Sequence, residues 1–454
     1  MEVDAVVVGL GPGGEQVAEE LSEAGLEVVG IEAELVGGEC PYWGCVPSKM
    51  MVRAADLLAE GRRIPGMAGA STVTPDWAPV ATRIREDATD FWDDQVAVDR
   101  LHDKGGRFIR GRARLTGPMS VEVGGEMVTA RHALVLSTGQ QPDIPPLFDA
   151  VPHWTNRGAM AAEAIPASLV VAGGGSVGLE VGQVMARFGA YVTIVEPGPR
   201  LASAEEPEVS ELIAEVLRRE GVDVRTGAAI ERVEPWGETG ATVHLADGTT
   251  VDGERLLVAT GRRSDLASLG VGVLGLDEEA DNIPVDGRMR VAPGVWAVGD
   301  VTGKGGYTHV ASFQARLCVA DILGRARPDA DYRAVPRVTF TDPEIGAVGL
   351  TEAEARRQGG DVTVFDQSIA SEARGWIHRG EGLVKLVARD GVLVGATSMG
   401  PNGGEVLGLL CLAVHAQVPL ETMRSMMFAY PTFHRAVDSA LWSPPRSEEK
   451  MAGA

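Results

Sequence analysis

The sequence lacks the features of a membrane or secreted protein. No apolar run approaches the roughly 18–20 residues that a membrane-spanning helix needs. Residues 1–9 enter an apolar strand pattern at once, so no basic segment with a signal-peptide cleavage site precedes that strand. We therefore expect a cytoplasmic protein with no membrane partner.

Basic charge is also in short supply. The 41 lysines and arginines are outnumbered by 64 aspartates and glutamates, which gives a formal net charge of −23. A field of that sign repels nucleic acid and anionic membrane surfaces. We therefore expect no nucleic-acid partner, while the charge itself indicates no particular substrate.

Cysteine is scarce, with four residues in the chain, which argues against a structural disulfide framework. Cys318 and Cys411 lie in apolar helical patterns, where small buried thiols are expected. No second cysteine pair or histidine cluster completes the roughly four ligands of a zinc site, so we predict no metal. Cys40 and Cys45 differ, because they share one short segment containing proline and glycine.

A chain of 454 residues is too long for one ordinary domain. Two β-α-β patterns begin near residues 4 and 169, each with an apolar strand, a helix and a second strand. From about residue 336, short strands alternate with helices, which is typical of an α+β domain with an antiparallel sheet. We predict an α/β fold with two Rossmann-like domains and a C-terminal α+β domain.

Other segments connect these units. The patterns predict a helix near 47–61 and a charged helical region over about 75–104. Two proline-containing stretches, 142–152 and 262–294, are typical of joints on either side of the second unit.

The first strand pattern ends in a GxGxxG turn, Gly9-Leu10-Gly11-Pro12-Gly13-Gly14. In such a turn the first glycine permits the bend, the second lets backbone approach a pyrophosphate, and the third lets the helix pack on the strand. The N-terminus of the following helix then faces the phosphates. Glu32 ends the next strand, 23 residues after Gly9, where a carboxylate can accept both ribose hydroxyls.

The second β-α-β pattern carries the same signature, Gly173-Gly174-Gly175-Ser176-Val177-Gly178, followed by Glu196 at the same 23-residue interval. One such turn is weak evidence, but two with an acid at equal spacing indicate two dinucleotide sites. A carboxylate at the ribose repels a 2′-phosphate, so Glu196 favours NAD(H) over NADP(H). Arg200 lies close by in sequence and could soften that preference.

The cysteine segment, 37–49, reads Gly-Gly-Glu-Cys-Pro-Tyr-Trp-Gly-Cys-Val-Pro-Ser-Lys. A regular helix would place Cys40 and Cys45 on different faces, but Pro41 and Gly44 argue against a regular helix. An irregular loop permits the Cα separation of about 4.4–6.8 Å that a disulfide needs. A helix beginning near Pro47 would place Cys45 at its N-terminus, where the dipole stabilises a thiolate. Two unrelated cysteines are the alternative, which the neighbouring dinucleotide signatures make less attractive.

With these motifs the chain resembles the pyridine nucleotide-disulfide oxidoreductase family, which includes dihydrolipoamide dehydrogenase, glutathione reductase and mercuric reductase. The pattern GGxCxxxGCVPSK is highly specific for that family, and the resemblance covers essentially the whole chain. Further family motifs occur in the family's order: Ser137-Thr138-Gly139, Ala259-Thr260-Gly261-Arg262-Arg263, Val298-Gly299-Asp300 and Thr341-Asp342-Pro343-Glu344.

The resemblance implies an FAD cofactor, a nicotinamide cofactor and a homodimer whose active site is shared between subunits. It implies four regions: an FAD-binding domain over 1–150, an NAD(P)-binding domain over 151–270, a central segment over 271–335 that returns to the FAD domain, and a dimerisation domain over 336–454.

The resemblance also implies roles for particular residues. Cys45 would be the thiol facing the flavin, and Cys40 the interchange thiol facing the substrate. Asp300 would bond the ribityl chain, and Lys49 and Glu180 would form an ion pair near the flavin, although both are equally well explained as solvated surface groups. Further contacts to the cofactors are expected from Gly38, Lys49, Ala113, Thr138, Gly139, Gly261, Arg262 and Gly299.

The sequence departs from the family near its C-terminus. Disulfide reductases of the family carry His-Pro-Thr-x-x-Glu there, whose His from the partner subunit is the acid/base for the interchange thiol. Here Tyr430 replaces that histidine and Arg435 replaces the glutamate. Tyrosine titrates near 10 and is a poorer base at neutral pH. His434 shares a face with Tyr430 if the segment is helical, so it is a candidate relay, as is His309 near the expected flavin site. For both, a simple surface or interface histidine is the better explanation.

Mercuric reductases also resemble this chain in having tyrosine at that position, but no cysteine follows Cys411 here, so their C-terminal cysteine pair is absent. Tyr42 and Trp43 lie between the two cysteines, where they could select a flat or apolar acceptor or belong to the local core.

Three hypotheses remain. The first is an FAD-dependent oxidoreductase of dihydrolipoamide dehydrogenase type, which passes electrons from NAD(P)H through Cys40 and Cys45 to a small-molecule acceptor. The second is an NAD(P)H-dependent reductase of a quinone, metal ion or other small electrophile, which the missing His/Glu pair motivates. The third is a non-enzymatic redox sensor, which the complete cysteine signature disfavours.

Overall fold

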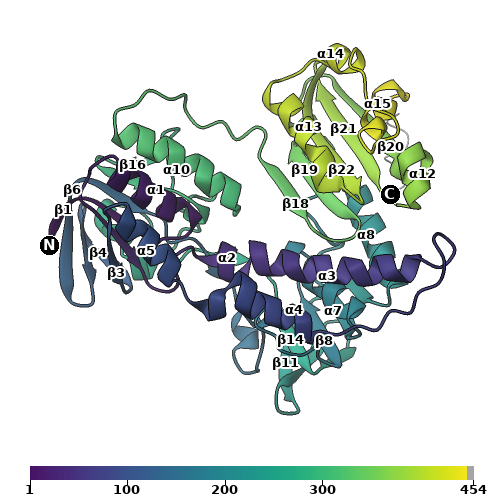
Figure 1. The fold of residues 1–454 in the computed structure, drawn as a ribbon, viewed down its shortest axis with the longest axis horizontal. Coiled ribbons are helices and arrows are strands. Elements are labelled where there is room, and N and C mark those ends of the chain that lie inside the picture. The colour runs from purple at the N-terminus through teal and green to yellow at the C-terminus, as the bar shows by residue number, and fades with distance from the viewer. Residues whose placement is uncertain (447–454) are drawn as a thin grey trace.

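The computed structural model describes residues 1–446 and builds them around three main sheets (Figure 1). The first sheet has eight strands, with the central order β16-β17-β6-β1-β2-β3 and with β4 and β5 attached through β6. Its strands are β1 (Glu2–Val8), β2 (Val28–Glu32), β3 (Arg107–Arg110), β4 (Ala113–Gly117), β5 (Ser120–Val123), β6 (Glu126–Leu136), β16 (Arg290–Ala292) and β17 (Val295–Ala297). Helices α1 (Pro12–Glu23), α5 (Gln95–Asp103) and α10 (Thr308–Ile322) pack with it.

The sheet order brings two distant parts of the chain together. Strands β1 and β2 run parallel, as the first β-α-β pattern predicts, and β6 joins β1 on the other side. Beyond β6 lies β17, which comes from the segment after the second unit and pairs with β6 in parallel. The loop after β17 therefore lies beside the glycine turn after β1.

The second sheet is parallel, with the order β10-β9-β8-β14. Its strands are β8 (Ser168–Ala172), β9 (Tyr191–Glu196), β10 (Asp223–Thr226) and β14 (Arg255–Val258), and its helices are α6 (Asn156–Met160), α7 (Ser176–Arg187) and α8 (Pro207–Arg219). An antiparallel meander of β11 (Ile230–Trp236), β12 (Gly240–Leu245) and β13 (Thr250–Gly253) lies beside it. The two short strands β7 (Gln141–Pro142) and β15 (Arg262–Arg263) pair where the chain enters and leaves this unit.

The third sheet is antiparallel, with the order β18-β19-β22-β21-β20. Its strands are β18 (Pro336–Thr339), β19 (Glu344–Gly349), β20 (Val362–Ser368), β21 (Leu383–Arg389) and β22 (Val392–Gly400). Its helices are α11 (Glu352–Gln358), α12 (Ala373–His378), α13 (Gly403–His415), α14 (Leu420–Arg424) and α15 (Arg435–Trp442). The predicted fold class, two Rossmann-like units and a C-terminal α+β unit, is confirmed.

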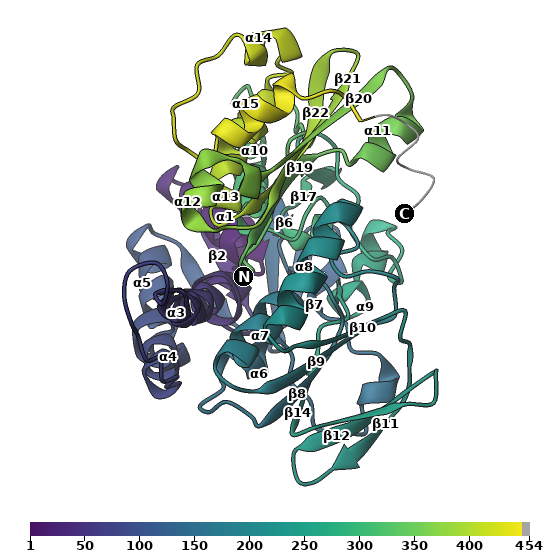
Figure 2. The same cartoon turned by 90° about the vertical axis from the view of Figure 1, so that its right-hand side faces the viewer.

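Helix α3 (Cys45–Arg63) passes beneath the third sheet and packs against α7 of the second unit (Figures 1 and 2). The helical region predicted over 75–104 is interrupted. It consists of α4 (Ala78–Arg83), a π-turn over Ile84–Ala88, a short 3₁₀ turn and α5, because residues 90–92 take left-handed backbone conformations that no helix continues through.

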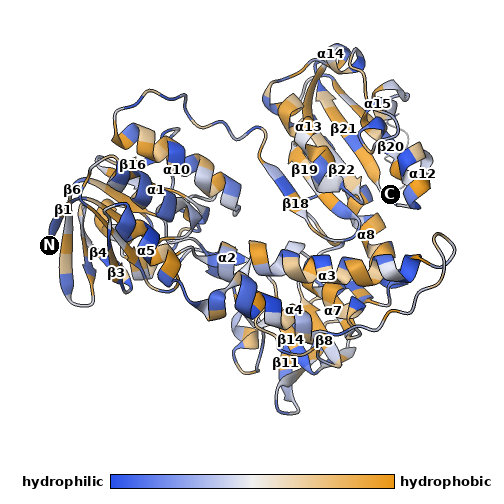
Figure 3. Ribbon diagram, viewed as in Figure 1, coloured by the Kyte–Doolittle hydropathy of each residue, from blue (hydrophilic) through white to orange (hydrophobic). Residues whose placement is uncertain are grey.

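Apolar residues line the strands of all three sheets and the helix faces turned toward them (Figure 3). Within residues 1–446, none of the helices combines the length and apolarity that crossing a bilayer requires.

Candidate active site

In the first glycine turn, the three glycines of the GxGxxG motif, Gly9, Gly11 and Gly14, have different surroundings. Gly9 has φ +88°, and a Cβ there would lie 2.3 Å from the carbonyl oxygen of Ser137. A Cβ on Gly14 would lie 1.9 Å from the carbonyl oxygen of Gly9. Gly11 differs, since its Cβ would find no heavy atom of residues 1–446 within 4 Å. Two glycines therefore make the turn compact, and the third leaves an open approach to the N-terminus of α1.

The second glycine turn repeats this geometry in the second unit. Gly173 has φ +115°, and its Cβ would lie 2.3 Å from the carbonyl oxygen of Ala259. A Cβ on Gly178 would lie 2.1 Å from the carbonyl oxygen of Gly173, whereas a Cβ on Gly175 would meet open space among the described residues. Gly175 is the N-cap of α7 and has no side chain to satisfy the first N–H groups of that helix.

The acids predicted at the ribose positions are held alike in both units. Glu32 accepts hydrogen bonds from the N–H groups of Leu10 at 2.7 Å and Glu34 at 2.8 Å. Glu196 accepts from the N–H groups of Gly174 and Gly198, each at 2.7 Å. Burial raises the pKa of Glu32, and the two N–H donors oppose that shift. Each acid is therefore fixed at the mouth of its glycine turn.

Arg200 was a candidate for weakening the preference of Glu196 for NADH, but its guanidinium is bound elsewhere. Its guanidinium donates to the carbonyl oxygens of Ser203 at 2.6 Å and Glu205 at 2.8 Å, and to the hydroxyl of Ser210 at 2.8 Å. These local acceptors occupy the side chain, so it does not lie free beside Glu196.

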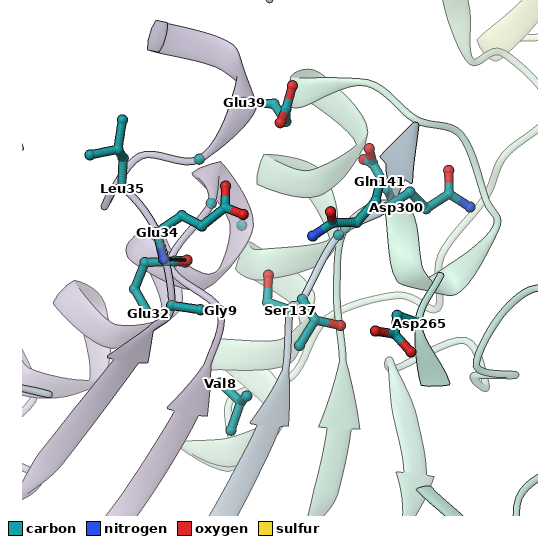
Figure 4. A pocket seen from close by; sticks show the side chains of 18 of the residues that line it. Val8, Gly9, Glu32, Glu34, Leu35, Glu39, Ser137, Gln141, Asp265 and Asp300 are labelled. Atoms are coloured by element: carbon teal, nitrogen blue, oxygen red, sulfur yellow. Dashed lines mark hydrogen bonds between the residues drawn. The ribbon is translucent and has the colours of Figure 1, made fainter. Parts of the chain in front are cut away.

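A trough runs from the first glycine turn across the carboxyl ends of the first sheet (Figure 4). Glu32 at the end of β2, Ser137 directly after β6 and Asp300 in the turn after β17 all line it (Figure 4). Its walls include ten of the residues predicted to contact a cofactor: Gly9, Gly11, Pro12, Gly13, Glu32, Gly38, Ala113, Thr138, Gly139 and Gly299. Asp300 and Arg262 line it as well and form an ion pair at 3.0 Å. Burial raises the pKa of Asp300, and the Arg262 guanidinium opposes that shift.

The two cysteines of the signature form a disulfide, with a Cα–Cα distance of 4.7 Å. Cys40 lies in α2 (Glu39–Trp43) and Cys45 is the first residue of α3. Gly44 separates the helices with φ −140° and ψ −108°, which is the predicted break in the helix. Cys45 therefore lies at the N-terminus of a 19-residue helix, where the dipole favours a thiolate.

A second helix N-terminus adds a donor to the same sulfur. The Thr308 hydroxyl of α10 lies 3.3 Å from Cys45 Sγ. His309, the next residue, stacks on Tyr307 and lies 2.9 Å through Nε2 from the carbonyl oxygen of Pro336. Sequence analysis identified His309 as a candidate but missed Thr308, although these two residues are the first two of α10.

Lys49 lies one helical turn after Cys45 and forms an ion pair with Glu180 of α7 at 2.8 Å. The Lys49 ammonium lies 4.4 Å from the ring centroid of Phe340. Glu180 also accepts the N–H of Phe340 at 2.9 Å. The predicted ion pair of Lys49 and Glu180 is present. Phe340 lies almost 300 residues from Lys49, and no pattern in the sequence indicates that it belongs to the site.

One cavity of about 1200 Å³ joins these groups. Its walls include both cysteines, the Lys49–Glu180 pair, and the start of α7 at Gly175 and Val177. Residues of the other units that also line it are Pro12, Gly261, Arg262, Asp300, Thr308, His309, Phe340 and Cys411. The start of the second nucleotide helix and the disulfide thus face the same space.

The predicted C-terminal candidates lie elsewhere within the chain. Tyr430 is 73 % exposed and does not line the cavity described above. His434 is the N-cap of α15, so residues 430–434 are not helical and the two side chains do not share a helix face. Arg435 pairs with Asp438 one turn later. Of the remaining cysteines, Cys318 is fully buried, as predicted, whereas Cys411 is half-buried and faces the cavity.

The trough and glycine turns fit FAD. A dinucleotide needs an approach to free N–H groups for its pyrophosphate and a carboxylate for its ribose, and Gly11 and Glu32 supply both. Gly175 and Glu196 supply the same pair of features for a second nucleotide.

Comparisons with known proteins agree with this geometry. Residues 3–315 match the family model for the pyridine nucleotide-disulphide oxidoreductases, and residues 335–441 match the dimerisation domain of the same family. The chain is 31 % identical to a dihydrolipoyl dehydrogenase of Chlorobaculum tepidum over 98 % of each chain. It is 30 % identical to a mercuric reductase of Bacillus cereus, over 99 % of this chain and 73 % of that protein.

Among solved structures, the Cu(II) complex of the HOCl-induced flavoprotein disulfide reductase RclA from Escherichia coli superposes with a TM-score of 0.84. It is 26 % identical in sequence, and the match covers 97 % of this chain and 99 % of that one. Sequence motifs, fold and site thus agree, and the chain belongs to the FAD-binding pyridine nucleotide-disulphide oxidoreductase family.

Proposed function

We propose that the protein is an NADH-dependent, FAD-containing reductase that passes electrons through the Cys40–Cys45 disulfide to a small-molecule acceptor, in the manner of dihydrolipoamide dehydrogenase. The observation that carries the proposal is the single cavity that the disulfide shares with the N-terminus of α7. FAD, when bound, accepts two electrons from a nicotinamide and releases them to a disulfide. Reduction breaks the S–S bond and gives two thiols, with NADH oxidised to NAD⁺; the hydride accounts for both electrons and one proton, and one further proton is taken up from solvent.

Cys45 is the thiol we assign to the flavin side. It is exposed to the cavity, and both the N-terminus of α3 and the Thr308 hydroxyl favour its thiolate form. Cys40, in the preceding short helix, is then the interchange thiol that meets the acceptor. Lys49, held by Glu180, supplies the positive charge one helical turn from Cys45.

The remaining predicted contacts divide between the two nucleotides. Gly11, Glu32, Asp300 and the other trough residues would hold FAD, with Asp300 accepting a ribityl hydroxyl. Gly175 and Glu196 would hold NADH. The carboxylate of Glu196 and the engagement of Arg200 elsewhere support NADH over NADPH.

The proposed enzyme is a homodimer with a shared active site. Tyr430 is exposed and lies in the segment that matches the family's dimerisation domain, which supports placing its ring at the partner's disulfide. Tyrosine there can donate a hydrogen bond but is a poorer base than histidine at neutral pH. We place the enzyme in the cytoplasm, where a reducing environment keeps Cys318 and Cys411 as thiols.

An anaerobic titration of the FAD-loaded protein with NADH tests this proposal. We expect two additional cysteines to become reactive toward a thiol reagent, and a long-wavelength absorbance band from a Cys45 thiolate beside oxidised flavin. Cys45→Ser should abolish the band and leave FAD bound. A band that persists in this variant contradicts the assignment.

The second candidate is a reductase of a non-disulfide acceptor such as a quinone or a metal ion. The exposed Tyr430 in place of a histidine favours it, and mercuric reductases are among the relatives. NADH oxidation by Cys40→Ser with lipoamide, a quinone, Cu(II) and Hg(II) separates the two. Loss of turnover supports the dithiol route, whereas undiminished turnover with one acceptor supports direct transfer to it.

A further inference from the structure

One buried face of α7 joins three parts of the molecule. Glu180, Gln183 and Arg187 follow each other at spacings of three and four residues, which places them on one side of the helix. Their exposed fractions are 7 %, 3 % and 3 %. Polar side chains are buried to this extent only when they are satisfied by partners, so their contacts define what the face does.

The first set of contacts is with the segment 340–342, in the part of the chain that matches the dimerisation domain. Gln183 accepts the N–H of Asp342 at 2.8 Å and donates to the carbonyl oxygen of the same residue at 2.9 Å. Arg187 donates to the Asp342 carboxylate at 2.8 Å. With the bond from the N–H of Phe340 to Glu180, four hydrogen bonds fix this segment on α7.

The second set of contacts is with α3, the helix that begins at Cys45. Lys49 binds Glu180 at 2.8 Å, and two turns later Asp56 binds Arg187 at 2.8 Å. Arg62 donates to the carbonyl oxygen of Arg187 at 2.8 Å. Helices α3 and α7 are therefore joined by three polar contacts along their length, and the segment carrying Phe340 binds the same face of α7.

We propose that Gln183 and Arg187 are positioning residues of the redox site, which hold the Lys49 ammonium between Glu180 and the Phe340 ring. A lysine side chain has a flexible four-carbon stem, so its charge acts at a defined place only when its partners are fixed. Besides Glu180 and Phe340, the Lys49 ammonium donates to the hydroxyl of the adjacent Ser48 at 3.1 Å. Glu180 lies on the same helix as Gln183, but the Phe340 ring depends on the backbone of 340–342. The inference rests on the proposed function, in which the Lys49 charge favours the Cys45 thiolate.

Gln183→Leu tests the proposal, because it removes both bonds to the Asp342 backbone and keeps a buried side chain of similar size. The measurement uses FAD-loaded protein carrying Cys40→Ser, in which Cys45 is a free thiol. Its rate of alkylation by iodoacetamide is followed against pH by mass spectrometry of the Cys45 peptide, which separates it from Cys411. Thr308, whose hydroxyl lies 3.3 Å from Cys45 Sγ, is not substituted in any variant.

We expect Gln183→Leu and Lys49→Met each to raise the apparent pKa of Cys45, by about one unit, or tenfold in the thiolate fraction. The double variant should show no further shift, because both changes act through one charge. The matched control is Gln314→Leu, a fully buried glutamine that bridges Gly299, Thr302 and Tyr332 instead. It should leave the pKa of Cys45 unchanged, with a similar loss of thermal stability.

Three outcomes overturn the proposal: an unchanged profile in folded Gln183→Leu, a shift that persists in the Lys49→Met background, or an equal shift in Gln314→Leu. Should Gln183→Leu not fold, Asp342→Asn, which weakens the bond to Arg187, takes its place with the same expectations. Alkylation requires no turnover, so a failure here is distinct from a failure of the proposed function, which Cys40→Ser turnover reports.

Discussion

Gly11 and Gly14 occupy the same turn but face opposite surroundings. Gly14→Ala would place a methyl group 1.9 Å from the carbonyl oxygen of Gly9, so the helix must move away from the strand. Overpacking of this kind costs roughly 1–3 kcal/mol or more of the free energy of unfolding. Gly11→Ala meets no neighbour among the described residues and has an ordinary backbone conformation, with φ −66°.

We therefore predict that Gly14→Ala lowers the melting temperature of the FAD-free protein, whereas Gly11→Ala leaves it unchanged and weakens FAD binding instead. Thermal unfolding and flavin titration of both variants measure the two effects. A Gly11→Ala protein that binds FAD as tightly as the wild type would contradict the placement of the pyrophosphate at this turn.

In the proposed function, Glu196 decides between the two nicotinamide cofactors. A 2′-phosphate placed beside its carboxylate would bring up to two further negative charges, so we predict that the wild type prefers NADH by kcat/KM. Glu196→Gln keeps an acceptor for a backbone N–H but removes the charge, and we expect the preference to fall by about tenfold, on the order of 1.4 kcal/mol. Steady-state kinetics with both cofactors tests this prediction. Glu32→Gln is the matched control in the first unit and should leave the ratio unchanged.

At the scale of elements, the contact between α3 and α7 has a predictable pH dependence. Burial raises the pKa of Asp56 to about 6, more than the Arg187 guanidinium lowers it. Stability that the protonated form provides is therefore lost as pH rises from about 4 to about 6. Burial acts in the same direction on Asp342, but Arg187 and Arg63 outweigh it and lower the pKa of that residue. Its contribution is present at neutral pH and is lost only at low pH.

Asp56→Asn and Asp342→Asn should consequently change the free energy of unfolding at pH 7 in opposite directions. Asp56→Asn should raise the free energy of unfolding at pH 7 and flatten its decline between pH 4 and 6, while Asp342→Asn should lower it at pH 7. Urea unfolding at pH 4.5 and 7 measures both. A loss of stability in Asp56→Asn at pH 7 would show that its bond to Arg187 outweighs the cost of burial.

Elements also differ in how well the sequence predicted them. The strands of both β-α-β units and the break before α3 follow from glycine and proline positions and from apolar periodicity. The region 75–104 was predicted as helical, but its middle is broken by left-handed residues 90–92. None of these residues is glycine, so sequence carries no local signal for the break. The stacking of Trp92 on Trp43 at 5.4 Å shows that tertiary packing holds this turn.

At the scale of the whole molecule, we predict that turnover depends on formation of the homodimer. Met427 is 99 % exposed, three residues before Tyr430, in the segment that matches the dimerisation domain. In the proposed homodimer, we expect this side chain to be buried against the partner subunit. We predict that Met427→Glu weakens dimerisation at least about tenfold, because a carboxylate loses its hydration there. Turnover should fall with the dimer population, since Tyr430 would act on the partner's disulfide.

Sedimentation velocity and activity over a range of protein concentrations measure the two quantities together. Trp236→Glu is the control, since it changes another exposed apolar residue, at the end of β11 and away from that segment. Full activity in a monomeric Met427→Glu protein would exclude a shared active site.

The sequence by itself determined the two nucleotide turns, the acids that follow them and the cysteine pair. The signals for these features lie in short stretches of sequence, so spacing reveals them, even though the carbonyl oxygens that approach Gly9 and Gly173 come from the distant residues Ser137 and Ala259. The ion pair of Lys49 and Glu180 came from resemblance to a family and not from any local pattern.

Only the tertiary structure decided which residues surround the disulfide. Thr308 and Phe340 come from segments more than 250 residues away from Cys45 and Lys49, and the Gln183–Asp342 bonds join residues 159 apart. Contacts of this kind form because segments from different units pack against α3, and no periodicity along the chain encodes that packing. Each glycine turn can therefore be recognised from its own stretch of sequence, whereas the position of the Lys49 charge relative to Cys45 is set by tertiary packing.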